Sequence, residues 1–411
     1  MNQKQLGILL VLLAALGGAG LVLSKRQNAS WSDAKPGIGK KLLGDFPVND
    51  VSRIVIKEGT NTLNLVKRDD LWRVSERGDY PANYLDISGF LLKARDLKVV
   101  QTETVGPSQL PRLQLAPAEQ GTGSAVTVEF KGQGDKLIKT LLLGKKHLKK
   151  SNRPSPSGEG GEGWPDGRYV KVGDSTEVAV ISDSLENIEP KPAQWLNKDF
   201  VHVEKARSVD VVFPSATNSW KLARETESGE WKLADSKPGE ELDSSKTAGV
   251  SSPLSSPSFT DILLSPKPEQ TGLDKPAVVT IGTFDEFTYV VKIGQKTNDD
   301  YPLTVAVTAQ ITNERPPGKD EKPEDKAKLD KEFSERRHKL EDKLKQEQSL
   351  EKWTYLVAGW TIDPLLKERS QLLTEKKEEP KAGGNSATNA LEKVDEPKLE
   401  NQTPPTVAPK E

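Results

Sequence analysis

Apolar side chains alternate with polar ones along several short segments of this chain, in two similar series. A period of two is typical of β-strands with one buried face. The first series begins near residue 51 and the second near residue 209. The apolar positions that open the two series are Val51, Ile54, Ile56, Leu63, Leu65, Trp72 and Val74 in the first, and Val209, Val211, Phe213, Trp220, Leu222, Trp231 and Leu233 in the second.

Further strands follow in each series, and landmarks recur at one spacing. Trp231 follows Trp72 by 159 residues, and a Leu-containing turn ends at Pro117 and again 159 residues later at Pro276. This shared offset predicts a duplicated module. Two unrelated α+β domains are the alternative. The later strands are expected around residues 126–130, 141–143, 169–172 and 178–181, then 278–281, 289–293, 302–307 and 353–357.

A helix is expected inside each copy, after the first hairpin. In the first copy it starts at Pro81, and its buried face consists of positions spaced three and four apart. In the second copy a shorter helix runs from Leu242 to Val250 and stops before Pro253. The fold class that follows is α+β, with two tandem antiparallel-sheet-plus-helix modules. The face of the first helix contains Tyr84, Ile87, Leu91 and Ala94, widened by Leu85, Leu92 and Leu97.

The N-terminal segment is apolar without alternation. Residues 6–23 form an uninterrupted apolar run of 18 residues, flanked by Lys4 and by Lys25 and Arg26. As a helix the run is about 27 Å long, close to the roughly 30 Å of a bilayer core. We therefore predict one uncleaved transmembrane anchor, and a cleaved signal peptide is the alternative. The anchor residues are Leu6, Leu10, Leu13, Leu16 and Leu23.

Composition shifts mark the boundaries between segments. Residues 149–167 are rich in Pro, Gly and Ser and predict a flexible insertion, and residues 376–411 are expected to be disordered. The predicted organisation is an anchor at 1–26, a linker at 27–47, a first module at 48–200, a second module at 201–375 with a charged helical insertion at 314–352, and a tail at 376–411.

The charged insertion has the pattern of a solvated helix. Residues 319–352 contain 22 charged side chains, 11 of each sign. Leu329, Phe333, Leu340 and Leu344 form a thin apolar stripe. We expect an exposed helix with one edge on its domain, and a coiled-coil docking arm is the alternative. Favourable i,i+4 ion pairs are expected for Glu332 with Arg336, Glu335 with Lys339 and Glu341 with Lys345.

Composition limits the chemistry. The chain of 411 residues has no cysteine, which excludes disulfides, thiolate nucleophiles and Cys-ligated metals. Its 59 basic and 61 acidic residues give a net charge of −2. No basic field of the kind that nucleic-acid binding requires is present, so we predict no nucleic-acid partner.

Catalytic signatures are not found in the sequence. His147, His202 and His338 are far apart, and no pair of them has metal-ligand spacing. Gly158, Gly160 and Gly163 fit G-x-G-x-x-G, but Trp164 and Pro165 follow where a helix would have to begin. We therefore expect no catalytic, cofactor-binding or metal-binding residues and no cofactor.

Two groups of aromatic residues have different predicted roles. Trp72 and Trp231 recur at the same place in both copies, which favours a core role. Trp353, Tyr355 and Trp360 flank the charged insertion and are a candidate partner surface.

The combined motifs resemble a known family. They are the N-terminal anchor, the hairpins that end in Trp-x-Val or Trp-x-Leu at Trp72 and Trp231, the turns that end at Pro117 and Pro276, and the strands that end at Gly144 and Gly294. The chain resembles, over about residues 1–375 without the insertions, a bacterial domain-of-unknown-function family of membrane-anchored proteins encoded beside gliding-motility-type ABC transporters. The family has no established catalytic residues. The resemblance implies an accessory to an ABC-type transport system.

Three functional hypotheses follow. The favoured one is a non-catalytic scaffold or binding protein, anchored by a single pass in the inner (cytoplasmic) membrane with its body in the periplasm, and with the membrane and ABC-type transporter subunits as partners. The second is a cell-envelope hydrolase or carbohydrate-active enzyme with a site between the modules. The third is a purely structural envelope spacer.

Overall fold

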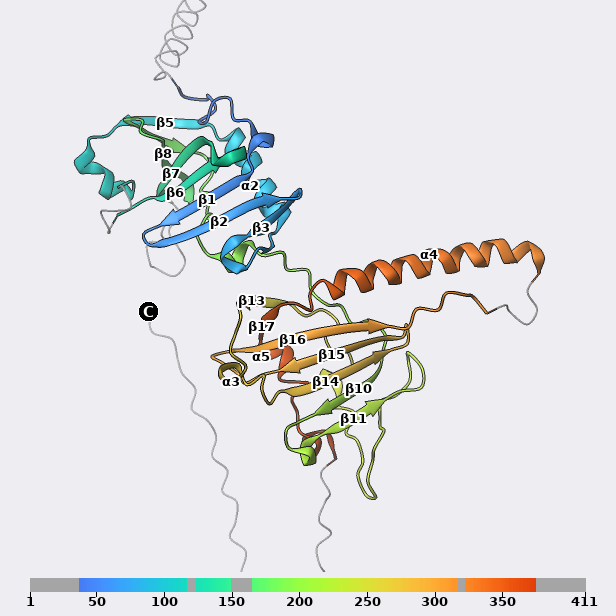
Figure 1. Cartoon of the computed structure of the whole chain (residues 1–411). Helices are drawn as coiled ribbons and strands as arrows, with labels where there is room; N and C mark the ends of the chain where they lie inside the picture. The colour runs from blue at the N-terminus through green and yellow to red at the C-terminus, as the bar shows by residue number, and fades with distance from the viewer. Residues whose placement is uncertain (1–36, 117–122, 149–164, 317–321, 375–411) are drawn as a thin grey trace, which may run out of the picture. The chain divides into compact units, whose positions relative to one another are not determined.

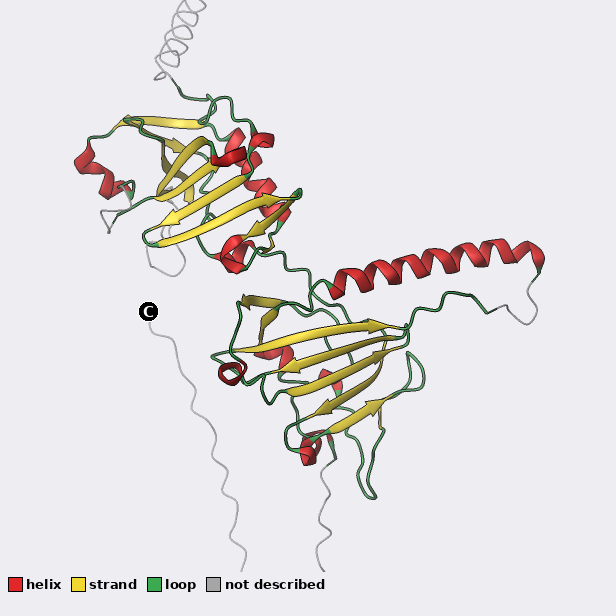
Figure 2. Ribbon diagram, viewed as in Figure 1, coloured by secondary structure: helices red, strands yellow, loops and turns green. Residues whose placement is uncertain are grey.

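The computed structural model of the chain describes residues 37–116, 123–148, 165–316 and 322–374. Within these ranges it is a mixed α and β structure with few helices and two antiparallel sheets, one of nine strands and one of eight (Figures 1 and 2). The predicted anchor at residues 6–23, the glycines at 158–163 and the tail at 376–411 lie outside the described residues. In the parts of the chain that are described, no helix has both the length and the apolar composition that a membrane span needs.

The first sheet has the order β4-β3-β2-β1-β6-β7-β8-β9-β5. Its inward positions are the alternating residues of the first series, and Ile54 and Ile56 are fully buried. Residue pairs such as Ile54 with Leu65 and with Phe130 fix the register of β1 against both neighbours. The strands are β1 (Arg53–Glu58), β2 (Asn61–Arg68), β3 (Leu71–Val74), β4 (Tyr80–Pro81), β5 (Val99–Thr104), β6 (Val126–Lys131), β7 (Leu137–Leu148), β8 (Pro165–Val172) and β9 (Glu177–Ile181).

One helix, α2 (Tyr84–Asp96), covers a face of this sheet. It begins later than Pro81 because Asn83 caps it: the Asn83 side chain accepts hydrogen bonds from the backbone N–H groups of Leu85 and Asp86. Pro81 belongs to β4 instead. The buried face contains Phe90, whose ring centroid lies 5.6 Å from that of Phe130.

The expected helix face is confirmed at four of its seven residues and wrong at three. Ile87, Leu91, Ala94 and Leu97 are buried, whereas Tyr84, Leu85 and Leu92 are exposed. Phe90 lies in the middle of the helix face that packs on the sheet, so residues on the opposite side of α2 face solvent.

The second sheet has the order β12-β11-β10-β14-β15-β16-β17-β13. If β4 is left aside, the strands of the two sheets follow the chain in the same sequence and occupy the same relative positions across the sheet. The strands are β10 (Ala206–Val212), β11 (Trp220–Ala223), β12 (Lys232–Leu233), β13 (Phe259–Leu263), β14 (Ala277–Thr283), β15 (Phe287–Ile293), β16 (Asp300–Ala309) and β17 (Thr354–Ala358). Its α-helices are α3 (Pro268–Thr271), α4 (Pro323–Gln348) and α5 (Gly359–Ile362).

Two expectations about local structure are wrong. The helix predicted from Leu242 to Val250 is only a 3-10 turn at Ala248–Val250, because a sequence rich in Ser and interrupted by Gly249 favours turns over helix. Residues 165–167, expected in the flexible insertion, are the start of β8, where Gly167 pairs with His147. The rest of that insertion, residues 149–164, lies outside the described residues.

The repeated tryptophans are placed differently in the two sheets. Trp72 is buried in β3, as predicted. Trp231 is half-buried beside the core, and the guanidinium of Arg224 lies 4.9 Å from its ring centre. The fully buried tryptophan of the second sheet is Trp220 in β11.

Candidate functional site: the polar contact of α4 with the second sheet

The α4 helix is the charged helix expected from the sequence, and one side of it is half-buried. Among the positions that lose solvent are Phe333, Arg337, Leu340, Leu344 and Glu347, spaced four and three residues apart. This spacing places all five on one face. Residues 325–332, at the other end of the helix, are exposed. The helix therefore contacts the sheet through its C-terminal part, beside β16.

The ion pairs of α4 differ from those expected. Lys328 pairs with Glu332, Lys331 with Glu335, and Arg337 with Glu341. Arg336, the expected partner of Glu332, reaches Asp285 at the edge of the sheet instead. Contact with the sheet thus outweighs pairing along the helix, which contributes only about 0.2–0.5 kcal/mol per exposed pair.

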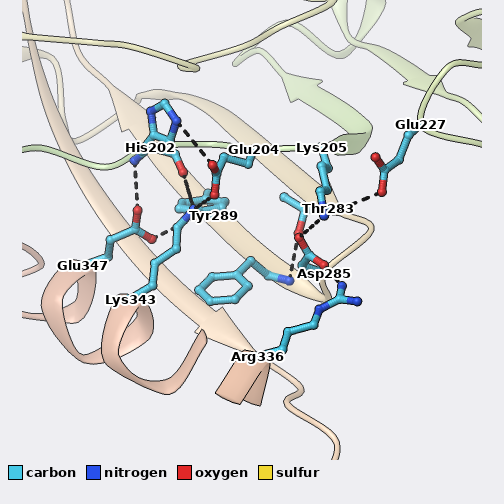
Figure 3. Close-up of polar contacts among 11 residues, drawn as sticks. His202, Glu204, Lys205, Glu227, Thr283, Asp285, Tyr289, Arg336, Lys343 and Glu347 are labelled. Carbon is cyan, nitrogen blue, oxygen red and sulfur yellow. Dashed lines mark hydrogen bonds and ion pairs between the residues drawn. The ribbon is translucent and has the colours of Figure 1, made fainter. Parts of the chain in front are cut away.

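The centre of the contact is a buried carboxylate on α4 (Figure 3). Glu347 is only 4% exposed. Its Oε1 accepts a hydrogen bond of 2.9 Å from the backbone N–H of His202, and its Oε2 accepts one of 2.9 Å from the hydroxyl of Tyr289 on β15. Both oxygens therefore have a protein donor, as a buried carboxylate requires.

A lysine one turn earlier completes this group. The Nζ of Lys343 donates to the carbonyl of His202 at 2.7 Å and to Glu204 Oε2 at 2.8 Å. It also lies 5.5 Å from the ring centre of Phe287. The Lys343 ammonium lowers the pKa of the Glu204 carboxyl. The segment before β10, residues 202–204, is thereby bound to α4 on one side and to β15 on the other.

Burial sets the protonation behaviour of the central pair. Removal from water raises the pKa of Glu347, although its hydrogen bonds and Lys343 act in the opposite direction. Burial and the neighbouring carboxylate raise the pKa of Tyr289, so its hydroxyl stays protonated as a donor. This combination can take up a proton on acidification, but it offers no activated nucleophile.

A second ionic group lies at the other end of the contact. Asp285 lies between Arg336 of α4 and Lys205, whose Nζ is 3.2 Å away. Burial by itself would raise the pKa of Asp285, but its two cationic neighbours outweigh burial and lower it. Lys205 also approaches Glu227 at 3.8 Å. The pair of Arg336 with Asp285 fixes α4 at a second point.

The end of α4 also covers an open edge of β16. Strand β17 pairs with β16 only from Asp300 to Leu303. Further along, the N–H of Val307 donates to Glu351 Oε1 at 2.8 Å, and its carbonyl accepts from the side chain of Gln348 at 3.2 Å. Side chains at the helix end thus satisfy backbone groups that another strand could otherwise pair with.

The residues singled out from the sequence are scattered. Among the three flanking aromatics, Tyr355 is fully buried in β17, Trp353 is half-buried, and only Trp360 is prominently exposed, at 71%. A partner can therefore reach Trp360 but not the Tyr355 side chain in this structure. The anchor residues Leu6, Leu10, Leu13, Leu16 and Leu23 lie outside the described residues.

The three histidines do not come together. His147 contacts Asp166 at 2.6 Å in the first sheet, His202 lies near Glu204, and His338 lies near Glu341 on α4. Among the described residues, no group of His, Asp and Glu side chains is arranged to hold a metal ion.

The sequence reasoning missed Glu347 and Tyr289. A signal was present, because Glu347 continues the half-buried spacing of Leu340 and Leu344, and a charged residue on the apolar stripe of a helix is unusual. Tyr289 was expected on an inward strand position, but not as the partner of a carboxylate.

Comparison with known proteins gives one family match. No curated protein matches the chain, and no solved structure matches it. Residues 158–276 match the family model described as "Domain of unknown function (DUF4340)". This range includes His202, Glu204, Lys205 and Glu227 of the α4 contact, but not Tyr289 or Glu347.

Proposed function

We propose that this protein is a membrane-anchored, extracytoplasmic scaffold or binding protein of an ABC-type transport system and that it acts without catalysis. The apolar run at residues 6–23 supports the anchor, with the body in the periplasm. The family resemblance supports the transport system, and the DUF4340 match is consistent with it.

The geometry of α4 is the observation that carries the proposal. One end of this 26-residue helix is fixed by Glu347 and by the ionic group at Asp285, while residues 325–332 at the other end are exposed. Asp330 in this exposed part pairs with Arg315 at 2.9 Å, and the other charged residues of both signs there present a surface for a polar partner. Trp360 adds an exposed aromatic side chain of the kind enriched at interfaces.

We further infer that the two sheets descend from one duplicated module. The shared strand order supports this inference. So does a contact at equivalent positions: a Cβ at Gly144 would lie 2.4 Å from the carbonyl oxygen of Leu113, and one at Gly294 would lie 2.1 Å from that of Thr271. A glycine therefore lets the preceding turn lie close to β7 in the first sheet and to the end of β15 in the second.

Co-purification from detergent-solubilised membranes tests the partner. A doubly substituted α4 variant, Lys328→Glu with Lys331→Glu, reverses two exposed charges. A matched control, Lys221→Glu with Lys292→Glu, reverses two exposed charges on the sheet. The proposal expects ABC-transporter membrane subunits to co-purify with the wild type and with the control, and to be recovered in smaller amounts with the α4 variant. Recovery of the wild type with no membrane partner contradicts it and favours the spacer hypothesis.

A second candidate function, a cell-envelope hydrolase, is favoured by one observation. A half-open cavity of about 610 Å³ lies between α2 and the segment after β9, and Asp86, Asp183 and Glu186 line it. Asp183 and Glu186 each have a lysine 3.5 Å away, Lys93 and Lys146, which is typical of structural pairs. Release of fragments from purified cell-wall polymer by the wild type, lost in Asp183→Asn, would establish the hydrolase. Our proposal predicts no release.

A further inference from the structure

An arginine of the first sheet is buried and has no carboxylate partner among the residues that the structure describes. Arg168 is on β8, on the same face as the fully buried Val170, and is only 8% exposed. Its Nε donates to the carbonyl of Gly144 at 2.8 Å. Its Nη1 donates to the carbonyl of Leu185 at 3.0 Å and, more weakly, to that of Ser184 at 3.4 Å. Three carbonyl groups thus orient the guanidinium.

The charge of Arg168 is not neutralised by any described residue at ion-pair distance. Two of the nearby acids have other partners: Glu186 pairs with Lys146 at 3.5 Å, and Glu189 pairs with Lys191 at 2.6 Å. The third, Glu58, lies on the wall of the same cavity but forms no ion pair with Arg168. Burial lowers the pKa of Arg168, and Glu58, Glu189 and Glu186 oppose this only from a distance. Buried charges in proteins are normally paired, because desolvation of an isolated ion costs several kcal/mol.

Arg168 lines a small polar cavity. The cavity has a volume of about 250 Å³, and its other polar side chains are Glu58, Gln114 and Ser124. Within the described part of the chain, none of these three side chains forms a hydrogen bond to the protein. The cavity therefore gathers the guanidinium of Arg168, whose Nη2 donates to no described residue, with an amide and a hydroxyl that no described residue engages, and with a carboxylate on the same wall.

We propose that this cavity binds a small oxyanion, the carboxylate or phosphate group of a ligand, through the Arg168 guanidinium. Because Nε and Nη1 of Arg168 already donate to backbone carbonyls, Nη2 is the nitrogen from which the guanidinium would donate a charge-assisted hydrogen bond to such a group. The Ser124 hydroxyl and the Gln114 amide supply further donors. Glu58 accepts from a hydroxyl or ammonium group elsewhere on the same ligand. This site is independent of the transport role proposed above.

The second sheet lacks the site. Leu143 pairs with Val170 in the first sheet, and Ile293 pairs with Leu303 in the second. Two residues before Leu303 is Tyr301, the equivalent of Arg168. The Tyr301 hydroxyl donates to Asp363 at 2.7 Å. An uncharged group with its own partner thus stands where the first sheet has a cation.

Calorimetric titration of the full chain in detergent tests the proposal. Sodium phosphate and sodium acetate are the two probes, each at constant ionic strength set with sodium chloride. The wild type should bind at least one probe saturably with one site per chain. Arg168→Gln should weaken binding at least about tenfold, the loss expected for a charge-assisted pair. Glu58→Gln should strengthen binding, because it removes a like charge from the wall.

The control is Arg207→Gln, which removes an exposed arginine of the second sheet that is paired with Glu286. It should bind like the wild type. Binding of phosphate alone, of acetate alone or of both identifies the oxyanion, and each supports the site. Failure of both probes to saturate would overturn it, as would equal losses in Arg168→Gln and Arg207→Gln.

A second variant covers the case in which Arg168→Gln does not fold. Ser124→Glu places a carboxylate in the cavity, where it can pair with Arg168. It should abolish binding of the probe and raise the melting temperature. Unchanged binding by a folded Ser124→Glu protein would contradict the proposal.

Discussion

The two sheets share their strand order but differ in what covers them. In the first, the 13-residue helix α2 lies between β4 and β5 and packs Phe90 on the sheet. In the second, the same place in the order has a 3-10 turn, and the 26-residue helix α4 is inserted between β16 and β17 instead. The hairpins are thus the common framework, and the features that distinguish the sheets are additions to it.

The additions also differ in chemistry. The contact of α2 with the first sheet is apolar, whereas that of α4 with the second depends on Glu347 and Asp285. An apolar contact gains stability from burial alone. A buried polar contact requires each group to keep its partner, because an unsatisfied group costs about 1–3 kcal/mol. The second sheet should therefore be the more sensitive of the two to single polar substitutions and to pH.

The largest effect is expected from Glu347→Ala. It removes the acceptor of the His202 N–H and leaves the Tyr289 hydroxyl with only its longer bond of 3.4 Å to the carbonyl of His202, and we expect a loss of about 2–4 kcal/mol in the free energy of unfolding. Denaturant unfolding measures this loss. Glu335→Ala, an exposed charge on the same helix, should change stability by less than about 0.5 kcal/mol. Equal effects of the two substitutions would show that the buried contact does not hold α4.

A smaller effect is expected from the paired glycines. Gly144→Ala and Gly294→Ala each push a methyl group into a turn carbonyl, and each should cost about 1–3 kcal/mol in unfolding free energy. Gly106→Ala, where a Cβ has open space, is the control. Similar losses at both glycines would support equivalent positions in a duplicated module. A neutral result at one of them would break the correspondence.

The smallest effect is the pH dependence that Glu347 contributes in the second sheet. The pKa of Glu347 is raised in the folded protein, so its contribution to stability is full below the unfolded value near 4.5 and is lost as pH rises through the folded value. Glu347→Gln should remove this contribution and flatten the stability profile over that window. Unfolding measured across the window in both proteins tests this, and identical profiles would contradict it.

Local patterns predicted the hairpins well, because period-two alternation records which residues face the core. Ile54, Leu65 and Val128 are all inward and buried, as expected. The edge strands β5 and β13 were missed. Each pairs with the last strand of its sheet, β9 or β17, and such distant pairing leaves no local signal.

The polar sites were harder to predict, because they depend on which side chains meet across elements. Arg168 is two residues from Val170 and so points to the same buried face of β8, which is unusual for an arginine. Nothing in the sequence, however, places Gln114 and Ser124 beside it. Likewise Glu347 follows the stripe of α4, while its partner Tyr289 is 58 residues earlier. The predicted 242–250 helix failed because weak local propensity was not reinforced by packing.

The most direct test of the central claim is the placement of the native chain in the cell. Intact cells and spheroplasts are treated with protease, and the N-terminus of the membrane-fraction protein is sequenced. The account predicts a membrane-bound chain that retains residues 1–26 and whose body is digested only in spheroplasts. A body that survives in spheroplasts and is cut only after lysis, or a chain dissolved in the cytosol, would contradict it.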